Sequence, residues 1–123
     1  MEERRVSYDI SFRVKVEGKD AYVPVGECSA NITWNVREII VRSTGLEWVN
    51  DESNGLCKDI MPKIKHGLDE LIDNPEKYEP YESPNGWGTV RGTRAFFMQI
   101  LDDWESFRRW YPEFVDVATF WID

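Results

Sequence analysis

The side chains with the greatest chemical potential in this sequence are two cysteines and one histidine, Cys28, Cys57 and His66. A thiol acts as a nucleophile only when a base lies within hydrogen-bond reach, and His66 is the single imidazole of the chain. Cys57 and His66 are nine residues apart, which places them on opposite sides of a continuous helix at about 100° per residue. A structural zinc site needs a cluster of cysteine and histidine, which one histidine does not supply. We therefore expect two free thiols, no bound metal and no cofactor.

A row of acids follows His66 on the same predicted helix. The spacing of His66 with Asp69, Glu70 and Asp73 could hold a divalent ion, but it is also typical of an ordinary solvated helix face. The pair Asp102-Asp103 is interpreted in the same way, as the exposed side of a later helix. We favour solvated faces in both places.

Two segments rich in asparagine and aromatic residues stand immediately before predicted helices, at residues 31–35 and 74–88. Each would bring polar side chains and backbone amides to a helix N-terminus, where partial positive charge collects and anions bind. The residues expected to bind a small anionic ligand, such as a nucleotide, are Asn31, Thr33, Asn35, Asn85, Trp87, Arg91 and Arg94. The alternative, which we favour for Trp87, is that the asparagines close turns and Trp87 packs into the edge of the core.

The formal net charge is −8, and most of it lies in the second half of the chain. Residues 51–123 carry 15 acidic and 8 basic side chains, against 8 and 7 in residues 1–50. A surface of this sign repels nucleic acids and anionic membranes and attracts a protein partner with a basic surface. The partner contacts are expected in the densest acidic region, at Asp69, Glu70, Asp73, Glu76, Glu79 and Glu82. The alternative is that the negative charge only keeps a small domain soluble.

The elements that must position these residues begin with two strands. Residues 7–16 alternate between apolar and polar side chains, which predicts a strand with one wet face and hence an antiparallel sheet. A second strand is expected at residues 21–28. Pro24 makes it an edge strand or a bulged one, because proline cannot donate to a strand ladder. Residues 29–34 are interpreted as a polar connection.

A short helix is predicted next, with Asn35 as its N-cap, Glu38 as the capping-box partner and Gly45 as its C-terminal stop. Residues 50–55 are turn-forming and are expected to be a loop. A longer helix is predicted over residues 56–73, where apolar residues recur with a 3.6-residue period. Its expected buried stripe is Cys57, Ile60, Met61, Ile64, Leu68, Leu71 and Ile72.

The longer helix contains Pro62, which is expected to kink or break it. Residues 75–88 are expected to form a loop, and a third helix is predicted over residues 89–111. Residues 114–121 are β-branched and aromatic enough for a last strand. The order of two strands, three helices and one strand predicts an α+β fold, a small antiparallel sheet of about three strands covered on one face by helices.

The length of 123 residues leaves room for a single domain, residues 1–123, with one core. No apolar run is long enough to span a bilayer, and residues 1–6 carry no apolar segment typical of a signal peptide. These features predict a cytoplasmic protein.

Three motifs, Asn31-Ile32-Thr33-Trp34-Asn35, Asn74-Pro75-Glu76-Lys77-Tyr78 and Asn85-Gly86-Trp87-Gly88, resemble those of a group of small acidic proteins of bacteria and of their phages and mobile elements. The resemblance covers about residues 5–121 and implies a bacterial cytoplasm and a phage origin. Together with the absence of an enzyme signature, this setting favours a non-catalytic binding protein, an accessory or anti-defence factor that inhibits a host defence protein such as a CRISPR-Cas or other nuclease component. A protein that sequesters a small anion at the two helix N-termini is the first alternative, and a hydrolase is the second.

Overall fold

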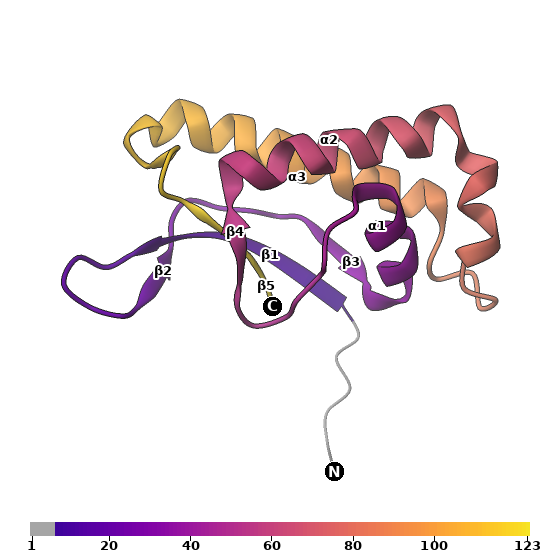
Figure 1. Ribbon diagram of the computed structural model, residues 1–123, viewed down its shortest axis with the longest axis horizontal. Coiled ribbons are helices and arrows are strands. Elements are labelled where there is room, and N and C mark those ends of the chain that lie inside the picture. Colours follow the sequence, from indigo (N-terminus) through magenta and orange to yellow (C-terminus); the bar gives the residue numbers. More distant parts are fainter. Residues whose placement is uncertain (1–6) are drawn as a thin grey trace, which may run out of the picture.

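A computed structural model describes residues 7–123 as two layers, with three helices on one face of an antiparallel sheet (Figure 1). The α+β class and the covering of one sheet face are confirmed. About three strands is too few, because five strands are present within residues 7–123. No helix in this range is long and apolar enough to cross a bilayer. Residues 1–6, on which the expectation about a signal peptide rests, lie outside the described residues.

The first strand occupies the centre of the sheet. It pairs with the last strand along one edge and with β2 and β3 along the other, and β4 extends the sheet beyond β5. The alternate residues Tyr8, Ile10 and Phe12 are buried beneath the helices, as the period of two predicts. The strands are β1 (Ser7–Lys15), β2 (Tyr22–Pro24), β3 (Asn31–Thr33), β4 (Ser53–Leu56) and β5 (Thr119–Ile122).

Two of the five strands lie where the sequence predicts none. β3 falls in the predicted polar connection and pairs with residues 7–9, and β4 falls in the predicted loop and pairs with β5. Both are short and held by backbone hydrogen bonds to a partner strand, so their own side chains carry little strand signal. The second predicted strand is shortened to β2, which ends at Pro24 on the edge of the sheet, as the proline predicts.

Residues 25–30, here called the crossing segment, leave the sheet between β2 and β3. The six residues of this segment lie opposite only three residues of β1. At its two ends, the Val25 N–H donates to the Phe12 carbonyl at 2.9 Å, and the Ile10 N–H donates to the Ala30 carbonyl at 3.3 Å. Figure 1 shows this stretch rising from the end of β2 toward α3 before it descends into β3. The crossing segment therefore contacts both the sheet and the helical layer.

The three helices are α1 (Arg37–Thr44), α2 (Cys57–Asp73) and α3 (Val90–Trp110). Asn35 is not an N-cap, because a 3-10 turn, Trp34–Val36, precedes α1 and the Asn35 amide donates to Thr33 Oγ1 at 3.1 Å. Gly45 ends α1 in the left-handed conformation, as predicted, with φ of 74°. Three further 3-10 turns are Pro75–Lys77, Glu79–Tyr81 and Pro112–Phe114, the last of which delays the final strand to Thr119.

Helix α2 continues through Pro62, so of the predicted kink or break the break is wrong. The proline is exposed in the second turn, and its cost is limited because buried neighbours, Ile60 and Ile64, anchor the helix on both sides. Gly67 brings the three helices together, since a Cβ there would lie 2.6 Å from Thr44 Cγ2 and 3.1 Å from Phe97 Cε2. Ile72, expected in the buried stripe, is 52% exposed at the end of the helix.

We expect Phe97→Ala to lower the free energy of unfolding by about 3–5 kcal/mol, because the Phe97 ring is completely buried and its loss leaves a cavity. Its neighbour Met98 on the same helix is 53% exposed, so Met98→Ala should change stability by no more than about 0.5 kcal/mol. Chemical denaturation of both variants measures the difference. Equal stability of the two variants would show that this face of α3 is assigned wrongly.

Candidate docking surface

Residues 69–82, which carry the six acids, form the end of α2 and the two 3-10 turns that follow it, at one end of the helical layer (Figure 1). The Glu70 side chain makes hydrogen bonds within this part of the protein. Its carboxylate accepts hydrogen bonds from the Tyr78 hydroxyl at 2.7 Å, from the Asn74 amide at 3.1 Å and from Lys77 Nζ at 3.3 Å. These bonds tie the turn after α2 back onto the helix.

The hydrogen bond between Glu70 and Tyr78 shifts the pKa values of both residues. The Tyr78 hydroxyl, followed by the Lys77 ammonium, holds the pKa of Glu70 below its ordinary value. Burial of the phenol, reinforced by the adjacent Glu70 carboxylate, raises the pKa of Tyr78 to about 12. The stable pair at neutral pH is therefore a Glu70 carboxylate with a protonated Tyr78.

Glu82 also makes an internal hydrogen bond, at the start of α3. Its carboxylate accepts the Val90 N–H at 2.8 Å, and Thr89 Oγ1 accepts the Gly92 N–H at 2.9 Å. These two bonds satisfy first-turn amides that have no partner within the helix. They also place a negative charge where the sequence predicts an anion, which disfavours a second anion at this helix end.

The remaining acids of the region face solvent. Asp69 pairs with Lys65 one helical turn away at 2.7 Å, and both side chains are exposed. Asp73, Glu76 and Glu79 are exposed, and within residues 7–123 no basic side chain pairs with them. Three of the six predicted contact acids are therefore free to meet a partner.

Residues 83–88 form a closed turn that displays Trp87. Asn85 Oδ1 accepts the Trp87 N–H at 2.9 Å, and the Ser83 N–H donates to the Gly88 carbonyl at 3.0 Å. Gly86 has φ of 77°, a conformation that glycine adopts without strain. The Trp87 side chain is 70% exposed. The expectation that Trp87 packs into the core edge is wrong, because the turn points its ring outward.

Gly88 joins the two asparagine-rich segments. It is buried against the other segment, and a Cβ at this position would lie 2.9 Å from the Asn35 carbonyl oxygen. The contact brings the predicted anion-binding segments together, but their amides are engaged locally. Asn31 donates to Asp9, and Asn35 donates to Thr33. Of the two arginines, Arg91 is exposed on the first turn of α3 and Arg94 is half-buried.

Two exposed side chains that the expected partner contacts do not include also lie at this end of the molecule. The Tyr81 ring is 37% exposed and lies beneath the Arg42 guanidinium of α1, 4.2 Å from ring centroid to Cζ. Ile72 is exposed one residue before Asp73. We call this surface the docking end and define it by six residues: Ile72, Asp73, Glu76, Glu79, Tyr81 and Trp87.

The residues considered for nucleophilic chemistry lie elsewhere. Burial raises the pKa of the Cys28 thiol to about 12, and this thiol donates to Asp103 Oδ2 at 3.3 Å. Cys57 is completely buried, and burial raises its pKa as well. Both thiols are therefore protonated at neutral pH, the unreactive form. His66 is exposed on α2, and no cluster of metal-binding side chains forms within the described part of the chain.

We expect Tyr78→Phe to raise the pKa of Glu70 toward its ordinary value, because the variant removes the hydroxyl that lowers it most. Since the folded-state pKa lies below the unfolded value, Glu70 stabilises the fold above the ordinary carboxyl pKa. That contribution is lost as the pH falls through the folded-state pKa. The acid limb of stability against pH should therefore be shallower in Tyr78→Phe.

Carboxyl-resolved NMR titration of Glu70 measures the shift directly. The control is Tyr81→Phe, which removes the hydroxyl of a neighbouring exposed tyrosine and should leave the titration of Glu70 unchanged. An identical Glu70 titration in both variants would contradict the assignment.

Comparison with other proteins adds no relative to this picture. The chain matches no protein family, no curated protein and no solved structure. The fold and the docking end are therefore described from the chain itself, and the resemblance to small acidic proteins of bacteria and phages stays a prediction.

Proposed function

We propose that this chain is a non-catalytic binding protein that docks its acidic end on a protein partner with a basic surface. The observation that carries the proposal is Trp87, a large aromatic side chain left 70% exposed by a turn whose hydrogen bonds are internal. Tryptophan and tyrosine are enriched among the residues that contribute most to binding energy at protein interfaces. Trp87 and Tyr81 together suit that role.

The turn also lowers the cost of binding. Ordering a flexible side chain or loop at an interface opposes association. Here Asn85 and Gly88 already fix the backbone on both sides of Trp87, and Arg42 covers one face of Tyr81. The aromatic residues would therefore bind with little loss of conformational freedom.

The free carboxylates supply the charge preference. Asp73, Glu76 and Glu79 are exposed carboxylates without a basic partner among residues 7–123, within a chain of net charge −8. Charge of this kind speeds the encounter with a basic surface, and the effect weakens as salt screens it. The proposal therefore includes an association rate that falls with ionic strength.

The resemblance to small acidic proteins of bacteria and phages directs the choice of partner. We propose a defence protein of the bacterial cytoplasm, such as a nuclease component, because proteins that hold nucleic acid carry basic grooves. Occupation of such a groove by the docking end would inhibit the nuclease without any chemical step.

Affinity capture from a bacterial lysate with the immobilised full chain, followed by binding measurements with the purified partner, tests the proposal. We expect Trp87→Ala to melt like the parent, within about 0.5 kcal/mol, and to bind at least about tenfold more weakly. The control Met98→Ala removes an exposed hydrophobic side chain from the middle of α3, outside the docking end, and should retain the partner. Unchanged binding by Trp87→Ala would refute the docking end.

The charge contribution needs its own comparison. The triple variant Asp73→Asn, Glu76→Gln, Glu79→Gln should slow association and flatten its salt dependence. A second triple variant, Glu17→Gln, Glu47→Gln, Glu113→Gln, changes the net charge equally at exposed sites elsewhere and should have the smaller effect.

In the affinity capture, elution of a small anion in place of any protein would favour the ligand-sequestering alternative instead.

A further inference from the structure

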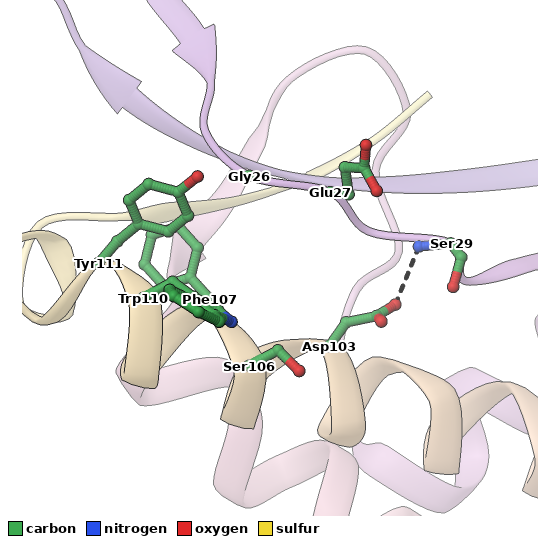
Figure 2. A pocket seen from close by; sticks show the side chains of 8 residues that line it. All are labelled: Gly26, Glu27, Ser29, Asp103, Ser106, Phe107, Trp110 and Tyr111. Atoms are coloured by element: carbon green, nitrogen blue, oxygen red, sulfur yellow. Dashed lines mark hydrogen bonds between the residues drawn. The ribbon is translucent and has the colours of Figure 1, made fainter.

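A hollow of about 500 Å³ lies at the opposite end of α3 from the docking end, between the crossing segment and the last turns of the helix (Figure 2). Helix α3 has 21 residues, so its two ends are about 30 Å apart at 1.5 Å per residue. The hollow is therefore separate from the docking end. It is lined by Gly26, Glu27, Ser29, Asp103, Ser106, Phe107, Trp110 and Tyr111.

Two contacts hold the crossing segment in place above α3. The Asp103 carboxylate accepts the Ser29 N–H at 2.9 Å and the Cys28 thiol at 3.3 Å. Gly26, with φ of 69°, lies so close to Tyr111 that a Cβ would be 3.0 Å from the ring. Only glycine combines this backbone conformation with this approach. The walls of the hollow are thus fixed by specific contacts.

The two ends of the hollow differ in chemistry. Figure 2 shows Phe107, Trp110 and Tyr111 at one end and Asp103 with Ser29 at the other. Trp110 is 73% exposed, the largest exposed fraction among the large hydrophobic residues whose side chains the structure describes. Within residues 7–123 no basic residue lines the hollow, whereas Asp103 and Glu27 are both acidic.

The acids act at different ranges. Asp103 also accepts the Gln99 amide at 2.9 Å, so three of about four acceptor positions on its carboxylate are used, and no basic side chain of residues 7–123 pairs with it. The Glu27 carboxylate is directed away from α3 (Figure 2). Asp103 would therefore touch a ligand, while Glu27 would add negative potential at the rim.

We propose that this hollow binds a guanidinium cation, as carried by an arginine side chain. A guanidinium group is planar, stacks on aromatic rings and donates hydrogen bonds at its edge to carboxylates and hydroxyls. Trp110 and Tyr111 supply the stacking surface, and Asp103 with Ser106 supplies acceptors beside it. The hollow falls in the size range of small-ligand pockets. This site goes beyond the docking end and does not depend on it.

Titration with N-acetyl-arginine amide tests the proposal, followed by tryptophan fluorescence and by backbone amide NMR shifts. Saturable binding with shifts at the crossing segment and residues 103–111 is expected. N-acetyl-citrulline amide has nearly the same shape without the charge, and it should bind at least about tenfold more weakly. Equal binding of the two compounds, or shifts located elsewhere, would overturn the guanidinium site.

Variants separate the site from the docking end. Trp110→Ala removes an exposed ring and should keep the parent's melting temperature while weakening arginine binding about threefold to thirtyfold. Asp103→Asn keeps an acceptor for the Ser29 N–H but removes the charge, and it should weaken binding further. Trp87→Ala should bind the arginine compound like the parent. A well-folded Trp110→Ala protein with unchanged affinity would refute the proposal.

The source of the cation follows from a second pair of probes. Free arginine carries an additional carboxylate and ammonium, whereas the capped amide imitates an arginine within a chain. Tighter binding of the capped form would assign the hollow to a peptide or protein, and tighter binding of free arginine would assign it to a small molecule. Both results support a guanidinium site.

Discussion

The contact of Phe12 with three other aromatic rings holds the two layers of this protein together. Its ring centroid lies 5.5 Å from those of Trp104 and Phe107 on α3 and 6.4 Å from that of Phe120 on β5. The two contacts with α3 are edge-to-face, a geometry that adds directional preference to the burial of a large apolar surface. Because α3 is fixed against the centre of the sheet, both of its ends have defined positions. One end carries the cap beside the docking end, and the other forms a wall of the hollow.

The fold could be predicted from the sequence wherever the signal is local. The periodic stripe of α2, the stop at Gly45 and the alternation of β1 all depend on neighbouring residues, and the structure confirms them except at Ile72. β3 and β4 could not be predicted, since their polar side chains pack little and partner strands distant in the sequence hold their backbones. Pro62 shows the reverse effect, because tertiary packing preserves a helix that the local signal would interrupt.

The acidic region could be located from composition, but the state of each acid could not. Glu70 and Glu82 differ from Asp73, Glu76 and Glu79 only in what folding brings beside them, the Tyr78 hydroxyl and the Val90 amide. The glycines around Trp87 permit an inward or an outward ring, and contact of Gly88 with Asn35 accompanies the outward one. The hollow carries no sequence signal, because its two walls meet through a bond between residues 74 positions apart.

The pairing of the first strand with the last also governs how the chain is made. Arg13 and Asp123 are 110 residues apart and form an ion pair at 2.7 Å, and two backbone hydrogen bonds join Asp9 to Asp123. On the ribosome, β1 is synthesised long before β5. The apolar side chains of Tyr8, Ile10 and Phe12 therefore remain without the neighbouring strand until β5 has been synthesised. Strands that are so far apart in the sequence pair slowly. A chain that stopped before residue 119 would therefore lack the strand that joins β1 to β4.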